Sequence, residues 1–343
     1  MDPIEALLRV SYLSDRGRLD KRKSEAFLKA AKVLQALPPD ELSQRIDNGT
    51  ITFLPGIGPS TAAVIQQAAA GKTPDRIVAL EAETQVPLGD GADLRARLQG
   101  DCHSHTEASD GSADLATMAA AAKAIGHHYL VITDHSPRLT VANGLSRDRL
   151  EAQLDQIAEL NESFAGQDFQ ILTGIEVDIL LDGSLDQDDD LLDRLDVVVA
   201  SVHSKLTMER AAMTRRMIAA VKNPRVDILG HCTGRKVQDT AFGPRELRKQ
   251  STFDAEAVFA ACADAGTAVE INSRPERQDP PDDLLQLAVE AGCEFSIDTD
   301  SHAPGQLEFV NYGADKAARH GISADRIITT RGADGLRAWT RGE

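Results

Sequence analysis

The hydrophobic pattern of the chain changes near residue 98. Before it, apolar residues recur at helical spacing through IEALLRVSYL and FLKAAKVLQAL, and the sequence LPP at Leu37 ends the second segment. After it, short apolar runs alternate with longer segments of helical periodicity. The pattern therefore predicts a helical domain over residues 1–97 and an α/β domain over residues 98–343.

Seven strands are predicted in the second domain, and helical segments separate most of them. The strands are expected in LQGDCHSH, YLVITDH, QILTGIEV, DVVVASVH, VDILGH, TAVEIN and EFSIDTDSH. Such alternation is typical of a parallel sheet, either closed as a barrel or doubly wound. No G-x-G-x-x-G sequence follows the first strand, which disfavours a dinucleotide-binding fold.

The cysteine content and the net charge indicate the cellular compartment and the kinds of partner to expect. Four scattered cysteines form no C-x-x-C pair, and no apolar run reaches the length of a membrane span, so we expect a cytoplasmic protein without a membrane partner. The whole net charge of −17 lies in the residues after 98, because the first 98 residues hold 13 basic and 13 acidic residues. That acidity repels nucleic acid unless bound cations reverse the sign inside a site.

Side chains that bind metal ions stand at the ends of all seven predicted strands. Residues i and i+2 of a strand point to the same side, so His103 and His105 can bind one ion together, as can Asp300 and His302. In a parallel barrel these ends converge on one face. The other candidates at strand ends are Asp134, His135, Glu176, His203, His231, Glu270, Asn272 and Asp298. One such histidine is more often a hydrogen-bonded loop residue, but six with matching carboxylates indicate a metal site.

The ligand types indicate the metal and the chemistry. Imidazole and carboxylate, without a thiolate, favour Zn, Mn or Fe(II). The candidates exceed the needs of one ion, so two or three ions are expected, with Glu176 as a bridge. Closely spaced ions suit phosphoester hydrolysis, because they acidify a water molecule and stabilise the leaving oxygen.

From about Gln99 to its C-terminus the sequence resembles the PHP domain (polymerase and histidinol phosphatase). The resemblance rests on DCHSHTEASDG, ITDHS, GIEVDIL, DGSLD, DVVVASVHSK, ILGHCTGR, VEINS and DTDSH. The helical part, with LPGIG, is similar to the first domain of bacterial family X DNA polymerases, which also end in a PHP domain. In those enzymes a palm and thumb separate the two domains, whereas here the connector is short. The resemblance therefore implies no nucleotide polymerisation.

The resemblance implies a distorted (β/α)7 barrel with a trinuclear metal centre. One ion would be held by His103, His105, Glu176 and Asp300. The second would be held by Glu176, His203 and His231. The third would be held by Asp110, His135 and His302, with Glu107 as the alternative to Asp110. The sequence departs from the family pattern at Cys232, where the polymerases usually have proline, and in NSRPERQDPP.

Two cations follow strand-end histidines. Arg235 in HCTGR and Lys205 in SVHSK can each hold a non-reacting phosphate oxygen in a catalytic role, and a surface salt bridge is the alternative for each. Glu270 and Asn272 are expected to orient ligands rather than to bind metal.

The turn PGIG leads directly into an alanine-rich helix in the first domain. This stretch resembles a helix-hairpin-helix motif, which in its family grips the DNA backbone without reading bases. A helix N-terminus attracts phosphate, so the candidate DNA contacts are Gly56, Gly58, Ser60 and Thr61. The sequence PST stands where a basic residue is often found, and packing between helices is the alternative interpretation.

These observations favour a metal-dependent phosphoesterase acting on DNA as a 3′–5′ exonuclease or 3′-end trimming enzyme, on single strands. The alternative is a phosphatase of a small monoester, similar to histidinol phosphatase. A third hypothesis is a barrel retained as a DNA-bound scaffold without activity.

Overall fold

The structure, a computed structural model, describes residues 1–238 and 245–343. The chain forms two compact units, Met1–Val86 with Ala303–Gln306, and Pro87–His302 with Leu307–Glu343. The sequence placed the boundary between residues 97 and 98. The intervening residues belong to the second unit because the backbone N–H groups of Gly89 and Gly91 donate to the Asp315 carboxylate, and Leu94 and Leu98 enter its core.

The first unit consists of helices, as the hydrophobic spacing predicts. They are α1 (Pro3–Arg16), α2 (Lys21–Gln35), α3 (Pro39–Asp47), the 3-10 turn Ile51–Phe53, α4 (Pro59–Ala69) and α5 (Asp75–Glu83). The Asp2 side chain caps α1, and α2 ends just before the LPP sequence, whose last proline begins α3. The apolar stripes of α1, α2 and α4 pack together through residues such as Leu7, Leu34 and Ile65.

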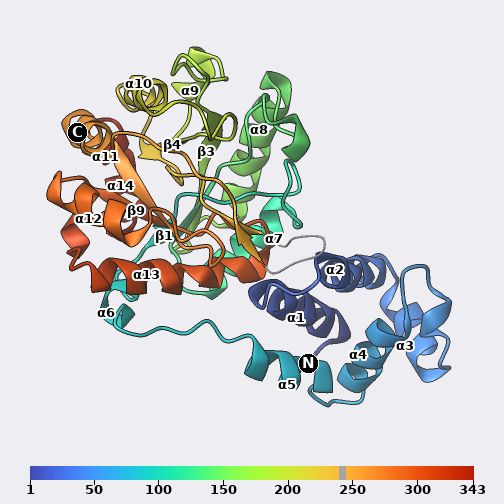
Figure 1. The fold of residues 1–343 in the computed structure, drawn as a ribbon. Helices are drawn as coiled ribbons and strands as arrows, with labels where there is room; N and C mark the ends of the chain where they lie inside the picture. The colour runs from blue at the N-terminus through green and yellow to red at the C-terminus, as the bar shows by residue number, and fades with distance from the viewer. Residues whose placement is uncertain (239–244) are drawn as a thin grey trace. The chain divides into compact units, whose positions relative to one another are not determined.

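The second unit is a nearly closed barrel of seven parallel strands, which confirms the predicted fold class (Figure 1). In spatial order the strands are β1 (Gly100–Asp101), β2 (Tyr129–Ile132), β3 (Gln170–Asp178), β4 (Val197–Ser201), β5 (Ile228–Leu229), β8 (Ala268–Asn272) and β9 (Phe295–Asp298). Just beyond β1 and β9, a parallel bridge joins Ser104 to Ser301. This bridge draws the first and last strands together, and with them the two predicted pairs of ligands.

One helix precedes β1, and further helices follow most strands of the barrel. They are α6 (Ala92–Arg95), α7 (Leu115–Ala124), α8 (Arg147–Ser163), α9 (Asp189–Leu192), α10 (Arg210–Val221), α11 (Ala255–Ala265), α12 (Asp282–Glu290), α13 (Val310–Arg319) and α14 (Ala333–Thr340). Between β5 and α11 lies a small antiparallel pair, β6 (Val237–Gln238) and β7 (Glu246–Leu247), which the sequence did not predict. None of the helices within the described residues has the length and apolar content needed to cross a bilayer.

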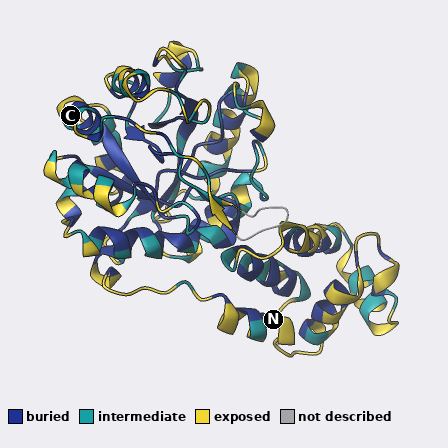
Figure 2. Ribbon diagram, viewed as in Figure 1, coloured by how far each residue is buried: buried dark blue, intermediate teal, exposed yellow. Residues whose placement is uncertain are grey.

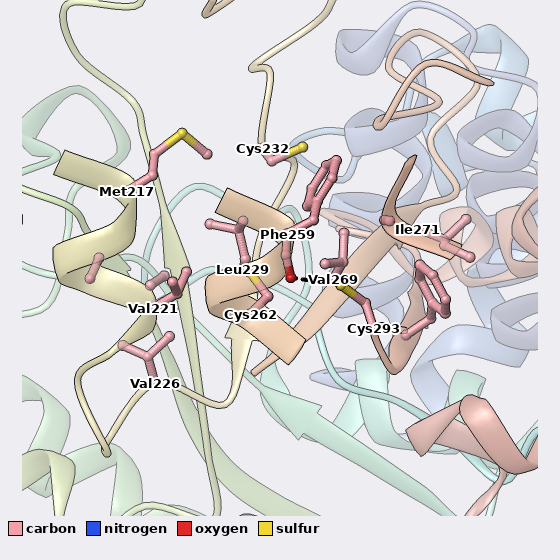
Figure 3. Close-up of a cluster of buried hydrophobic side chains, with 14 of the residues drawn as sticks. Met217, Val221, Val226, Leu229, Cys232, Phe259, Cys262, Val269, Ile271 and Cys293 are labelled. Carbon is pink, nitrogen blue, oxygen red and sulfur yellow. Dashed lines mark hydrogen bonds between the residues drawn. The ribbon is translucent and has the colours of Figure 1, made fainter. Parts of the chain in front are cut away.

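The core lies between the barrel and its helices, and it decides which side chains face inward. Figure 2 shows the strands as buried, and Figure 3 shows Val269 and Ile271 among buried side chains that include Phe259 of α11. Because side chains alternate along a strand, Glu270 and Asn272 of β8 point to the opposite side. The four cysteines are free and buried, as expected for reduced thiols.

Candidate metal centre

The carboxylate of Glu176, on β3, lies at the centre of a group of imidazoles. Its two oxygens lie 2.8–3.6 Å from ring nitrogens of five histidines, namely His103, His105, His135, His203 and His231. The Glu176 side chain is 1% exposed. The histidines lie in the segments that follow β1, β2, β4 and β5, and Glu176 lies on β3, so the closure of the barrel creates the cluster.

All nine predicted ligands fall into four groups whose ligand atoms lie within 4.8 Å of one another. One group contains His105, Asp110, His135 and His302. A second contains His103, His105 and Asp300. The other two share Glu176, one with His103 and His231 and one with His135 and His203. The structure thus divides the predicted second set, because His203 and His231 meet Glu176 in different groups. Glu107, the alternative to Asp110, is exposed and lies outside the four groups.

Several ligand atoms of this cluster are buried without a hydrogen-bond partner, which is expected of atoms that bind metal ions. Both oxygens of Glu176, both ring nitrogens of His105 and His203, and Nε2 of His103 are buried without a hydrogen-bond partner. A buried polar atom left unpaired costs about 1–3 kcal/mol, so native proteins normally supply a partner. Imidazole and carboxylate are ligands that Zn, Mn and Fe(II) accept. These residues can therefore hold metal ions of that class.

Glu270 and Asn272 form hydrogen bonds that hold the candidate ligands in position. Oε1 of Glu270 lies 2.6 Å from Nδ1 of His103, and Oε2 accepts a hydrogen bond from the backbone N–H of His231 at 2.5 Å. The amide of Asn272 donates to Glu270 at 3.2 Å and to Asp300 at 3.3 Å. These contacts orient the ligands and leave Nε2 of His103 directed toward Glu176.

The electrostatics of the cluster favour the metal-binding form of His105. Burial, together with His302 and His135, lowers the pKa of His105 well below its ordinary value. Burial alone would raise the pKa of Glu176, but His103, His203 and His135 hold it well below its usual range. Neutral imidazole and ionised carboxylate are the forms that bind metal.

Asp134, a strand-end candidate, has a structural role instead. Its carboxylate accepts hydrogen bonds from the backbone N–H of Thr106 at 2.8 Å, the Thr106 hydroxyl at 2.6 Å and the Gln153 amide at 2.6 Å, and also from the hydroxyl of Ser109. Thr106 and Ser109 belong to the loop that carries Asp110, and Gln153 belongs to α8. Asp134 therefore fixes that loop, whereas the next residue, His135, reaches Glu176.

With this geometry established, comparison with known proteins places the chain in a family. Residues 101–274 match the family model of the PHP domain, which covers half of the chain. The chain belongs to the PHP domain family. The match does not reach the helical unit, so the helix-hairpin-helix motif stays a prediction.

Relatives of the PHP barrel include both kinds of enzyme that the sequence suggested. The chain is 34% identical over 245 residues to the DNA polymerase/3′-5′ exonuclease PolX of Bacillus subtilis (strain 168), covering 71% of this chain but only 41% of that protein. It is 27% identical to a probable phosphatase of Thermoanaerobacter sp. (strain X514), covering 68% of this chain and 91% of that one. The predicted enzyme class, a hydrolase of phosphoester bonds, is that of this family.

Among solved structures, the chain is similar to histidinol phosphate phosphatase from Lactococcus lactis subsp. lactis Il1403. The two are 19% identical with a TM-score of 0.46, covering 64% of this chain and 93% of that chain.

Two arginines beside the PHP site had no role in the sequence analysis. Nε of Arg277 lies 3.0 Å from Oδ2 of Asp300, and Nη1 of Arg274 donates to the Asp300 backbone oxygen at 2.8 Å. Burial would raise the pKa of Asp300, but Arg277 and Arg274 hold it well below its ordinary value. The only sequence signal was the altered segment NSRPERQDPP, which contains both residues.

The two predicted catalytic cations lie in different surroundings. Lys205 is exposed, with a left-handed backbone at φ 57°. Arg235 is half-buried and lines a cleft of about 520 Å³ that includes Arg210 and Phe253. The catalytic roles of Lys205 and Arg235 stay predictions.

The predicted DNA contacts border a cleft of about 940 Å³ in the helical unit. Gly56, Gly58 and Ser60 are exposed there, at the start of α4. The Thr61 hydroxyl accepts the Gly58 N–H at 2.9 Å and donates to the Gly58 carbonyl oxygen at 3.0 Å. The Thr61 hydroxyl therefore stabilises the first turn of α4, and the four predicted DNA contacts stay a prediction.

Proposed function

We propose that this protein is a metal-dependent phosphoesterase that removes nucleotides from the 3′ ends of single-stranded DNA. It would hold two or three divalent ions, Zn, Mn or Fe, on His103, His105, Asp110, His135, Glu176, His203, His231, Asp300 and His302. The observation that carries the proposal is the buried Glu176 carboxylate, which has five imidazoles around it and no hydrogen-bond partner on either oxygen.

Closely spaced divalent ions, when bound, lower the pKa of a water molecule and polarise a phosphoryl oxygen. The protein's own residues orient the metal ligands and compensate the charge of the phosphate. Glu270 fixes the tautomer of His103 through its 2.6 Å contact. Arg274 and Arg277, beside Asp300, place two guanidinium groups at the edge of the site, where they suit the non-reacting oxygens of a phosphate.

Two features support DNA as the substrate. The 34% identical relative is named a polymerase and 3′-5′ exonuclease. The cleft of the helical unit is bordered by the exposed N-terminal turn of α4 together with Lys23 and Arg76. Helix N-termini and cations both attract phosphate, so this cleft would hold the DNA backbone without reading sequence.

The central experiment is an incubation with a 5′-labelled single-stranded oligonucleotide and Mn²⁺, followed by gel electrophoresis. We expect a descending ladder of products that a His103→Ala variant does not produce. An oligonucleotide left intact with Mn²⁺, Zn²⁺ and Fe²⁺ would refute the exonuclease.

A second candidate function is hydrolysis of a small phosphate monoester, as in a histidinol phosphatase. It is favoured by the probable phosphatase relative, which the match covers over 91% of its length. The same preparation should be tested on a generic phosphate monoester. Turnover of the monoester with an intact oligonucleotide would assign the protein to this class, and fewer than two bound metal ions per chain would favour the inactive scaffold.

A substitution that adds one negative charge tests whether the helical unit contacts DNA. Ser60→Glu places an acidic residue in the first turn of α4, which stabilises a helix but repels phosphate. Gln66→Glu adds the same charge at an exposed position farther along α4. We expect only Ser60→Glu to weaken DNA binding by the full chain and to flatten its dependence on salt. Equal effects of the two variants would reduce the cleft to a packing feature.

A further inference from the structure

The cleft lined by Arg235, in the barrel unit, has the features of a binding site, and its lining residues include none of the candidate metal ligands. It has a volume of about 520 Å³ and is formed by residues from the start of α10, the loop after β5, the segment before α11 and the start of α12. That volume lies within the range of roughly 300–1,000 Å³ that is usual for small-molecule sites.

Three polar atoms of this cleft are buried and have no hydrogen-bond partner. They are Nε of Arg235, Oε1 of Gln250 and Oγ of Ser251. Ser251 is only 4% exposed. One atom is a donor, one is an acceptor and the hydroxyl can be either, so together they match a ligand with hydrogen-bonding groups of both kinds. Buried polar atoms in native proteins normally have partners, so these three point to a ligand.

The remaining lining groups narrow the chemistry of that ligand. Arg210 and Arg235 provide guanidinium groups, which suit phosphate oxygens, and they outnumber the one acidic lining residue, Asp283. Phe253 adds an apolar ring surface. A phosphate, a ring and both donors and acceptors occur together in a nucleotide.

The cleft is tied directly to the metal centre by the loop that carries His231. The Gly234 N–H donates to the His231 carbonyl oxygen at 2.8 Å, so residues 231–234 form a turn, and Ser251 N–H donates to the Thr233 carbonyl oxygen at 2.7 Å. Turn ends lie within about 7 Å, and one further residue adds about 3.8 Å. The Cα atom of Arg235 therefore lies within about 11 Å of that of His231, so a strand whose end lies at the metal centre can place a neighbouring nucleotide in the cleft.

We propose that this cleft, lined by Arg210, Arg235, Gln250, Ser251 and Phe253, is a subsite for an upstream nucleotide of the strand whose 3′ end lies at the metal centre. The inference rests on the proposed exonuclease function. It assigns Arg235 to a phosphate near the scissile bond rather than to the reacting phosphate. A small monoester has no second nucleotide to place there, so the subsite would select polymeric substrates.

The test compares two substrates of different length. Thymidine 5′-monophosphate p-nitrophenyl ester has no upstream nucleotide, whereas a tetranucleotide has three. The Gln250→Leu and Ser251→Ala variants should each raise the ratio of the tetranucleotide KM to the ester KM by about three- to tenfold, the value of one hydrogen bond. Arg215→Gln, at an exposed position of α10, is the matched control for an Arg210→Gln variant, which should act in the same direction.

The outcomes separate the two proposals. If the wild-type protein cleaves neither substrate, the exonuclease proposal fails. If it cleaves both, and the variants leave the KM ratio unchanged, the subsite is refuted while the exonuclease stands. Two variants guard against misfolding, because Ser251→Ala removes one atom whereas Gln250→Leu changes a half-buried side chain. Melting temperatures equal to the wild type would confirm that each variant is folded.

Discussion

Nδ1 of His103 lies 2.6 Å from Oε1 of Glu270, and both side chains are fully buried. A carboxylate can only accept, so Nδ1 carries the proton of this contact, and Nε2 is the ring nitrogen that faces Glu176. The second oxygen of Glu270 accepts the backbone N–H of His231. Each oxygen of this carboxylate therefore positions a different candidate ligand.

Glu270→Gln should lower metal affinity and phosphoesterase activity by about 10- to 100-fold. An amide has one oxygen, whereas His103 and the His231 backbone offer two donors, so one donor must face the amide nitrogen. Metal content after dialysis and hydrolysis rates at increasing metal concentration measure the effect.

The control for this variant is Glu290→Gln, which removes the same charge from an exposed position of α12. It should keep the metal affinity of the wild type. A Glu270→Gln protein that also kept it would show that the contact with His103 does not position the ligand.

Removal of metal should destabilise the barrel unit. The oxygens of Glu176 and the nitrogens of His105 and His203 have no protein partner, so chelation leaves them buried and unpaired. An ion present at 100 times its dissociation constant stabilises the folded state by about 2.7 kcal/mol, which is about 5–10 °C in melting temperature for a unit of this size. The one tryptophan of the chain, Trp339, packs against the barrel core, so its fluorescence reports this transition.

Glu176→Gln provides the control for that melting experiment. Without the central carboxylate the groups that contain Glu176 lose their shared ligand. Chelator should therefore shift the melting temperature of this variant less than that of the wild type. An equal shift in both proteins would place the stabilising ions elsewhere.

The sequence predicted the seven strands and the convergence of their ends, because apolar runs and period-two spacing carry that information directly. The strand pattern alone did not separate the roles of Asp134 and His135, which are adjacent at one strand end, and only the resemblance to the PHP domain selected His135 as a ligand. Neighbouring residues of an extended chain point to opposite sides, so only one of them can face the centre. The alternation of side chains along the strand contains this information, but a choice of candidates by residue type alone does not use it.

The arginines beside Asp300 lay beyond the reach of the same reasoning. Arg274 and Arg277 stand in an irregular segment after β8, where no periodicity predicts the direction of a side chain. Their approach to Asp300 arises from the path of the loop. The division of His203 and His231 between two groups likewise depends on the closure of the barrel, which no local pattern encodes.

Asp134→Ala should destabilise the barrel unit by about 3 kcal/mol or more and weaken the metal group that contains Asp110. The backbone N–H and hydroxyl of Thr106, the Ser109 hydroxyl and the Gln153 amide would lose their acceptor, and each unpaired buried donor costs about 1–3 kcal/mol. Asp134→Asn, which keeps one acceptor oxygen, should cost less. Chemical denaturation followed by Trp339 fluorescence orders the three proteins. If both variants matched the wild type, the loop would be held by other contacts.

Asp15, in the helical unit, should make the stability of that unit depend on pH. Burial raises its pKa from 3.8 to about 7, although the Ser24 hydroxyl, at 2.5 Å, and Lys21 oppose the rise. The folded state therefore keeps a proton that the unfolded chain releases near pH 4. Stability should be greatest below pH 4, fall as the pH rises to about 7, and stay constant above it.

Asp15→Asn, neutral at every pH, should remove this dependence. At pH 8 the variant should exceed the wild type by up to about 4 kcal/mol, since three pKa units correspond to that free energy, whereas at pH 4 the two should be similar. Amide hydrogen exchange in α1 and α2, corrected for the intrinsic rate, measures the difference within this unit. Asp47→Asn, at an exposed position of α3, is the control and should show no such trend. If the wild-type unit were as stable at pH 8 as at pH 4, the ionisation of buried Asp15 would not lower the free energy of unfolding, and the prediction would be wrong.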